Sequence, residues 1–183
     1  KYMTSDTFKI DGMKPGQIYK GMIQPFEGLS IRGVCWYQGE SNCMIEDQDT
    51  YVEKMRVFEN NLRKVFNDEL IPFFTVQISP YLYSARKDPK VHSPELLPLF
   101  QEAQTRCLQL SRTYMVVTTD LADNLKDIHP SYKWEVGHRL ALQALAVIYG
   151  KNGVNAWSPS FSLMKRKKNK LIVTLADTGG QLR

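Results

Sequence analysis

The stretch IRGVCWYQGESN, residues 31–42, changes character halfway along its length. Its first half is an apolar run that is typical of a buried strand. Directly after Trp36 and Tyr37, the chain presents an amide, a glycine, a carboxylate, a hydroxyl and a second amide at residues 38–42. Open α/β sheets place their functional groups on loops at the carboxyl ends of strands. The stretch therefore predicts an α/β fold with a site at this end of the sheet.

Strand-like and helix-like segments alternate along the chain on both sides of this stretch. The expected strands are residues 31–37, 72–78 and 114–118, and the expected helices are residues 18–26, 49–67, 93–110 and 132–149. The third helix has a good start signal in Ser93-Pro94-Glu95, a capping hydroxyl followed by proline and an acid. Because strands and helices alternate, we expect a mostly parallel, three-layer α/β domain.

The pattern changes to a period of two after Trp157, which predicts two short antiparallel strands at 161–164 and 171–175. We therefore expect a partial α/β domain over residues 1–152 and the start of a small β-rich region over residues 153–183. The end of the chain, GGQLR, reads as an interruption of this second region.

The net charge of +5 over 183 residues is modest, and much of it lies in the run KRKKNK at residues 165–170. This run lacks interleaved aromatic residues, so a solvated hairpin turn is favoured over a nucleic-acid surface. No segment is long and apolar enough for a transmembrane helix, and no membrane partner is expected. The three cysteines fit no zinc spacing, and we expect neither a metal nor a cofactor.

His129 is the strongest candidate for a general base. It lies in the segment Asp127-Ile128-His129-Pro130, where the proline keeps the loop extended. A catalytic histidine needs an acid that orients its ring and stabilises the imidazolium. Asp127 is close in sequence, although a spacing of two residues tends to turn the two side chains apart. Glu40, from the other polar segment, is the alternative acid.

Three residues next to Glu40 are expected to bind substrate or the oxyanion: Gln38, Gly39 and Asn42. Gln38 has a neutral amide that can donate to a developing oxyanion, and Gly39 allows the backbone to approach a ligand closely. The nucleophile is not evident, because Ser41 lies in no Gly-x-Ser-x-Gly turn. Cys43 is the other local candidate, but nothing in the sequence indicates a lowered pKa for its thiol.

The two polar segments resemble blocks of a known family. GVCWYQGESN at 33–42 resembles the middle block of the sialate O-acetylesterase family, a branch of the SGNH hydrolases related to carbohydrate acetylesterases. DIHP at 127–130, followed by VGHRLA at 136–141, resembles the last block of that family. YKGMIQP at 19–25 resembles its lead-in, so the resemblance spans about residues 15–150.

The resemblance implies a flavodoxin-like α/β/α sandwich that hydrolyses acetyl esters on sugars with a Ser–His pair and no metal. It implies that Gln38 is an oxyanion donor and that His129 is the base. Lys126 stands where many of these enzymes have their aspartate. Glu40, whose counterpart partners the histidine in some related acetylesterases, is therefore the stronger expectation for the acid. Family members are commonly secreted, periplasmic or lysosomal.

The family's nucleophilic serine lies in a Gly-Gln-Ser-Asn block after the first strand, and this sequence has no such block. We therefore expect a fragment, truncated on its N-terminal side, that is inactive alone and whose sheet lacks a strand. The missing N-terminal part of the same protein, or a second copy of the chain, would then be a partner. The expected function is removal of O-acetyl groups from sugars, most simply sialic acids. The alternatives are a non-catalytic glycan-binding module on the same fold and a xylan or other carbohydrate acetylesterase.

Overall fold

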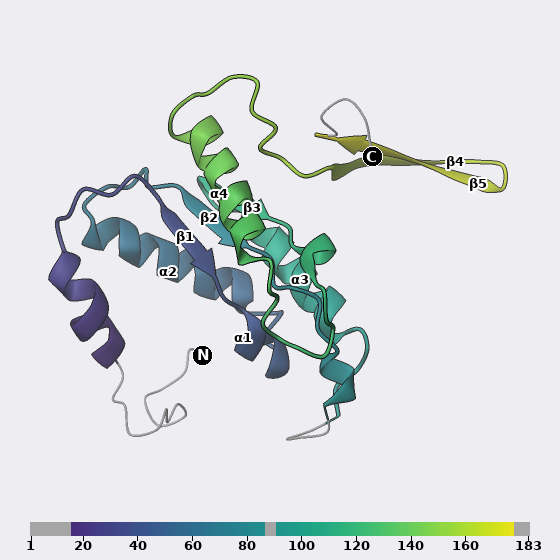
Figure 1. Ribbon diagram of the computed structural model, residues 1–183, viewed down its shortest axis with the longest axis horizontal. Coiled ribbons are helices and arrows are strands. Elements are labelled where there is room, and N and C mark those ends of the chain that lie inside the picture. The colour runs from purple at the N-terminus through teal and green to yellow at the C-terminus, as the bar shows by residue number, and fades with distance from the viewer. Residues whose placement is uncertain (1–15, 87–90, 178–183) are drawn as a thin grey trace.

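The computed structural model describes residues 16–86 and 91–177. Its centre is a parallel three-stranded sheet with the order β1-β2-β3 (Figure 1). The strands are β1 (Val34–Tyr37), β2 (Phe73–Val76) and β3 (Thr113–Val116). The last residues of the three strands lie opposite one another, so the carboxyl ends of all three strands meet at one end of the sheet.

Helices cover both faces of this sheet (Figure 1). On one face lie α2 (Tyr51–Val65) and α3 (Leu96–Arg106), and on the other face lies α4 (Lys133–Val147). Two short helical turns, Tyr19–Ile23 and Gln24–Phe26, precede β1. The predicted three-layer α/β fold with a parallel sheet is confirmed.

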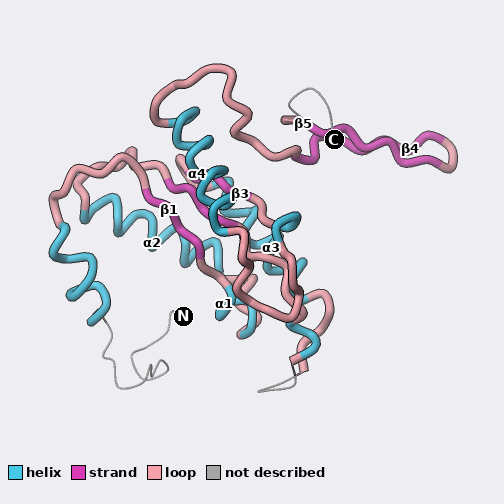
Figure 2. Tube along the Cα trace, in the orientation of Figure 1, coloured by secondary structure: helices cyan, strands magenta, loops and turns pink. Residues whose placement is uncertain are grey.

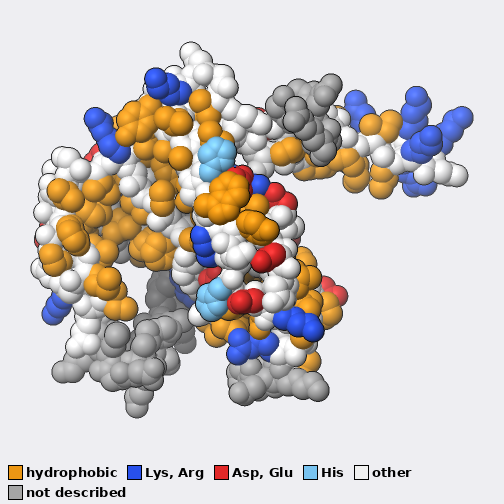
Figure 3. Space-filling view, in the orientation of Figure 1, with side chains coloured by type: hydrophobic (Ala, Val, Ile, Leu, Met, Phe, Trp, Pro, Cys, Tyr) orange, Lys and Arg blue, Asp and Glu red, His pale blue; other side chains and the backbone are white. Residues whose placement is uncertain are grey.

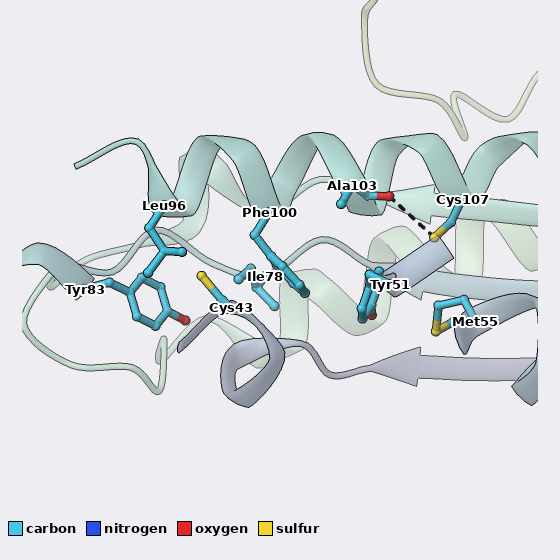
Figure 4. Packing of buried hydrophobic residues seen from close by; sticks show 9 residues of the cluster. All are labelled: Cys43, Tyr51, Met55, Ile78, Tyr83, Leu96, Phe100, Ala103 and Cys107. Atoms are coloured by element: carbon cyan, nitrogen blue, oxygen red, sulfur yellow. Dashed lines mark hydrogen bonds between the residues drawn. The ribbon is translucent and has the colours of Figure 1, made fainter. Parts of the chain in front are cut away.

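A hydrophobic cluster fills the space between α2, α3 and the sheet (Figure 4). Its buried members are Cys43, Tyr51, Met55, Ile78, Tyr83, Leu96, Phe100, Ala103 and Cys107. On the opposite face, Val76 of β2 packs with Val136 of α4 and with Leu121. Burial of one large apolar side chain stabilises a fold by roughly 1.5–3 kcal/mol, so these two clusters hold the layers together.

The polar residues 38–42 were expected to form a loop after the strand, and this prediction is wrong in part, because Glu40–Met44 form the short helix α1. The helix begins after Gly39, whose carbonyl accepts a 2.8 Å hydrogen bond from the N–H of Cys43. Cys43 is buried in the hydrophobic cluster, so packing stabilises a helix that its polar residues do not favour by themselves.

Side chains of α4 bond to two carbonyls at the outer edge of β3. Gln143 Nε2 donates to the carbonyl of Met115 over 2.8 Å, and Arg139 Nη1 donates to the carbonyl of Val117 over 2.9 Å. The two donors are four residues apart on one helix face, and the two acceptors are two residues apart on the strand. Residues four apart lie on one face of a helix, and residues two apart point to the same side of a strand, so the two donors meet the two acceptors. Two outward-facing carbonyls of the strand edge thereby gain a hydrogen bond without a further strand.

The outer edge of β1, like that of β3, has no strand partner among the described residues. Cys35, in the middle of β1, is exposed. Beside β1 and α2 lies an apolar groove of about 590 Å³, lined among others by Ile23, Trp36, Phe58 and Leu62. The two outer edges thus differ in that side chains of α4 bond to two carbonyls at the edge of β3, whereas an apolar groove lies beside β1.

The strands β4 (Ser160–Lys167) and β5 (Lys170–Ala176) form an antiparallel hairpin that stands apart from the sheet (Figures 1 and 2). The register pairs Met164 with Val173 and Arg166 with Leu171. The basic residues gather towards the turn, where Figure 3 shows them in blue. The predicted hairpin with a solvated basic turn is confirmed, although its strands are longer than expected.

Candidate functional site

Gln38, Gly39 and Glu40 follow β1 at the end of the sheet where the three strands terminate. Gly39 has a φ of 153°, and a Cβ at this position would lie 2.9 Å from both Ile78 Cγ2 and Phe100 Cε1. Only glycine lets the backbone pass this close to the hydrophobic cluster without a shift. The core therefore fixes the point from which Gln38 and Glu40 extend.

Both the backbone and the side chain of Gln38 are held by neighbours. Its carbonyl accepts hydrogen bonds from the hydroxyl of Tyr51 and from Gln104 Nε2, both at 3.3 Å. Its side-chain Nε2 donates to Asn42 Oδ1 over 2.6 Å, and Asn42 Nδ2 donates to Asp47 Oδ2 over 2.7 Å. Asn42, expected to touch the substrate, thus links Gln38 to a buried carboxylate. One N–H of Gln38 remains for an oxyanion, which stays a prediction.

Glu40 is half-buried in the first turn of α1. Its negative charge affects the pKa of a neighbouring group at this end of the sheet. Burial raises the pKa of the Tyr37 hydroxyl, and the nearby carboxylate of Glu40 raises it further. An acid in this position is able to support a positive charge that develops beside it.

The structure disfavours Cys43 as a nucleophile. The residue is fully buried, and burial, together with the charge of Glu40, raises the pKa of its thiol to about 12. Such a thiol stays protonated at neutral pH, whereas the thiolate is the nucleophile. Ser41 is exposed on α1, and no hydrogen bond of the described residues joins its hydroxyl to a histidine.

His129 lies in the loop between β3 and α4. Its Nδ1 is 3.4 Å from Asp127 Oδ1, and the same oxygen accepts a 2.9 Å hydrogen bond from the main-chain N–H of His129. The side chains of His129 and Asp127 are 86% and 56% exposed. The bond from the carboxylate to the amide two residues on is that of an Asx turn, so Asp127 shapes the loop. Among the described residues, no hydrogen bond or ion pair joins His129 to Glu40 or Gln38.

Arg139 fastens both ends of the loop that carries His129. Its guanidinium donates to Asp120 over 2.8 and 2.6 Å, and to the carbonyl of Val117 over 2.9 Å, at the start of the loop. It also donates to Glu135 over 2.9 Å in the first turn of α4. Hydrogen bonds from Arg139 lower the pKa values of the Asp120 and Glu135 carboxyls. These four hydrogen bonds hold the two ends of the loop together through one guanidinium group.

The two polar segments start at the same end of the sheet. The ammonium of Lys133, in the first turn of α4, lies 4.3 Å from the ring centroid of Tyr37, the last residue of β1. This contact brings the helix that follows His129 next to the strand that precedes Gln38. The convergence of His129, Gln38 and Glu40 on one cleft stays a prediction.

A cavity lies beside each outer strand of the sheet. A polar cavity of about 490 Å³ lies next to β3 and is lined in part by Arg139 and Trp157. The other is the apolar groove beside β1. Neither of these two cavities is lined by Gln38, Glu40 or His129.

Within residues 16–86 and 91–177, no group of three or more His, Cys, Asp and Glu side chains could hold a metal ion. No helix in the same residues has the length and apolar character that crossing a membrane requires.

Asp47 and Gln104 are among the residues that hold Gln38 and that were not recognised from the sequence. Asp47 stands in the run EDQD at 46–49, which reads as a solvated loop, yet it is buried. Gln104 gave a usable signal, because it is a polar residue on the same helix face as Phe100 and Cys107. A polar side chain on an apolar helix face is buried only with a hydrogen-bond partner, and here the partner is the carbonyl of Gln38.

Comparison with known proteins gives one consistent family. The family model described as carbohydrate esterase, sialic acid-specific acetylesterase, matches residues 8–146. Sialate O-acetylesterase from Mus musculus is 29% identical over 155 residues, which cover 78% of this chain and 28% of that protein. Sialate O-acetylesterase from Homo sapiens is 29% identical over 162 residues, which cover 80% of this chain and 30% of that protein.

A solved structure gives the same picture. The crystal structure of a carbohydrate acetylesterase from Xanthomonas citri superposes with a TM-score of 0.74 and 32% sequence identity. The match covers 89% of this chain and 36% of the solved chain. The chain therefore spans about a third or less of the length of the relatives that it matches.

Proposed function

Because the chain belongs to the family of sialic acid-specific acetylesterases among the carbohydrate esterases, we propose that it takes part in removing O-acetyl groups from sugars, most simply sialic acids. The observation that carries the proposal is the match over residues 8–146, which includes both polar segments. The held amide of Gln38 at the carboxyl end of β1 supports it further.

In the proposed reaction, a serine from outside these 183 residues attacks the acetyl carbonyl carbon. His129 takes the proton from the serine hydroxyl, and Gln38 donates a hydrogen bond to the oxyanion of the tetrahedral intermediate. Collapse of the intermediate releases the sugar alcohol, which receives the proton from His129. Water then hydrolyses the acetyl-serine to acetate by the same steps and frees the serine. Glu40 or Asp127 stabilises the imidazolium.

The supply of the serine from another segment is supported by two observations. Cys43 is buried with a raised pKa, and no hydrogen bond joins the Ser41 hydroxyl to a histidine in the described structure. The unpaired edge and apolar groove of β1 provide room for the strand that would carry the serine. The strand would come from the rest of a longer protein, or from a second copy of the chain.

The test is an acetate-release assay with the longer protein that contains this chain. O-acetylated sialic acid and acetylated xylan are the two substrates, and His129→Ala and Gln38→Ala are the two variants. We expect the sialic acid ester to be the better substrate, and each variant to lose about 10²-fold or more in kcat. Binding of the glycan without acetate release would instead support the non-catalytic module, and a preference for acetylated xylan would change the substrate class.

A further inference from the structure

A chain of hydrogen bonds runs from α2 to the side chain of Gln38. Lys54 Nζ lies 2.7 and 2.6 Å from the two carboxylate oxygens of Asp47. Asp47 Oδ2 accepts from Asn42 Nδ2 over 2.7 Å, and Asn42 Oδ1 accepts from Gln38 Nε2 over 2.6 Å. Thr50 also donates its hydroxyl to Asp47. The ion pair between Lys54 and Asp47 is thus connected through the Asn42 amide to the Gln38 amide. We call this series of hydrogen bonds the relay.

The negative charge of Asp47 sets the donor and acceptor direction of the hydrogen bonds in the relay. An ionised carboxylate only accepts hydrogen bonds, so Asn42 must turn its NH₂ group towards Asp47. Its carbonyl oxygen then faces Gln38, and because that oxygen only accepts, Gln38 must present its own NH₂ group. A neutral partner at position 47 would impose no such direction, since an amide or alcohol donates as well as accepts.

Asp47 has the properties that this role requires. Its side chain is 8% exposed, whereas the Lys54 side chain that pairs with it is 33% exposed. Burial by itself raises the pKa of the Asp47 carboxyl, but hydrogen bonds from Lys54, Thr50 and Asn42 outweigh it and lower the pKa overall. The residue is therefore ionised at neutral pH. A buried charge of this kind orients neighbouring dipoles strongly.

We propose that Asp47, held by Lys54, is a positioning residue that sets the orientation of the Gln38 amide through Asn42. The inference rests on the proposed function in one respect, the role of Gln38 as the oxyanion donor. One N–H of Gln38 is used by Asn42, and the second is left for the substrate. If the amide turned over, a carbonyl oxygen would stand where the donor is needed, and it would repel the oxyanion.

The other contacts described above hold the backbone at Gln38 and do not set the orientation of its side-chain amide. The carbonyl of Gln38 is already held by Tyr51 and Gln104, and the next residue, Gly39, is packed against the core. Loss of Asp47 would therefore alter the amide more than the position of the backbone. The expected effect is on the transition state rather than on substrate binding.

The activity test compares Asp47→Asn with Asp49→Asn in the longer protein. Asp49 is exposed in the same loop, so its substitution makes the same change of charge without touching the relay. Removal of an oxyanion donor costs about 10²–10³-fold in kcat, and we expect a misoriented donor to cost about 10-fold, with KM within about two-fold of the wild-type value. Asp49→Asn should leave both constants unchanged, and Asp47→Glu should restore part of kcat.

Asn42→Leu is the second variant, because it cuts the relay and keeps the ion pair between Asp47 and Lys54. It should lower kcat like Asp47→Asn, and it keeps the proposal testable if Asp47→Asn does not fold. An unchanged kcat in a folded Asp47→Asn or Asn42→Leu protein would overturn the inference, as would a loss of kcat that Asp49→Asn shares.

A second readout does not depend on activity. In ¹⁵N spectra of the 183-residue chain, the side-chain NH₂ signals of Gln38 and Asn42 should be distinct in the wild type and in Asp49→Asn. In Asp47→Asn both signals should broaden or move together. An inactive wild-type enzyme with this spectral change would refute the proposed function and keep the relay, whereas an active enzyme without it would refute the relay.

Discussion

Asp127 Oδ1 lies 3.4 Å from Nδ1 of His129 and 2.9 Å from the main-chain nitrogen of the same residue. The shorter contact is a good hydrogen bond, and the longer one is outside the usual range for nitrogen and oxygen. Both side chains are largely exposed, and exposed ion pairs contribute at most about 1 kcal/mol. The contact is therefore one that sets the shape of the loop.

This geometry leads to a prediction about the acid of the site. In the active, longer protein, Glu40→Gln should lower kcat by about 10²-fold or more, and Asp127→Asn should lower it less, because water screens the exposed Asp127 carboxylate. The measurement is kcat for acetate release by the two single variants. A larger loss in Asp127→Asn would assign the orienting role to the local acid.

The packing at Gly39 predicts a loss of stability on substitution. Gly39→Ala should lower the free energy of unfolding by about 1–3 kcal/mol, since the new methyl group meets Ile78 and Phe100 and the φ of 153° is unfavourable for alanine. Urea unfolding of the chain measures this change.

Gly137→Ala is the matched control, because it lies within α4 with no atom within 4 Å of a new Cβ. This change should be neutral, or should stabilise the chain by up to about 1 kcal/mol through helix propensity. Equal changes in the free energy of unfolding for the two substitutions would contradict the prediction that close packing at Gly39 makes a Cβ unfavourable there.

The buried carboxyl of Glu59 gives a third prediction. Thr113 donates to it over 2.8 Å, and Arg63 lies 3.5 Å from the same oxygen, while burial raises the pKa of the Glu59 carboxyl. Glu59→Ala should cost about 3–5 kcal/mol, because the positive charge of the buried Arg63 then keeps only neutral hydrogen-bond partners, the carbonyls of Ile71 and Ser111 among them. Glu59→Gln keeps an acceptor for Thr113 and should cost much less. Denaturant unfolding of both variants, compared at neutral pH, decides between these outcomes.

Two aspartates predict how stability depends on acid. The pKa values of Asp47 and Asp120 are held below the ordinary value of 3.8, so each group adds stability at pH values above about 4. That stability is lost as the pH falls through the lowered pKa values, because the unfolded chain takes up its protons at a higher pH than the folded protein does. The urea midpoint should therefore be lower at pH 3 than at pH 6, and Asp47→Asn should reduce this difference. Equal midpoints would contradict the assignment.

The 183-residue chain alone should turn over a chromogenic acetyl ester at close to the buffer rate. The reason is chemical, since the buried Cys43 is protonated and Ser41 lacks a histidine partner in the described structure. A chain that hydrolysed the ester at ordinary enzyme rates, about 1–10³ per second, would instead identify Ser41 as the nucleophile. Ser41→Ala is the variant that would then confirm it.

The fold was largely predictable, because hydrophobic periodicity marks strands and helices that bury one face. The helix at Glu40–Met44 was missed, since it depends on the close packing of Gly39 and the burial of Cys43 rather than on local preference. The relay from Lys54 to Gln38 was missed for a similar reason. Its members are spread over residues 38–54, and their meeting depends on how the loop that carries Asp47 folds back between Asn42 of α1 and Lys54 of α2.

Gln143 and Arg139 occupy two carbonyl oxygens at the outer edge of β3. A strand that added to this edge would need those oxygens as acceptors, and it would first have to displace both side chains. Edge-to-edge association through β3 therefore carries a cost that a new strand would have to offset.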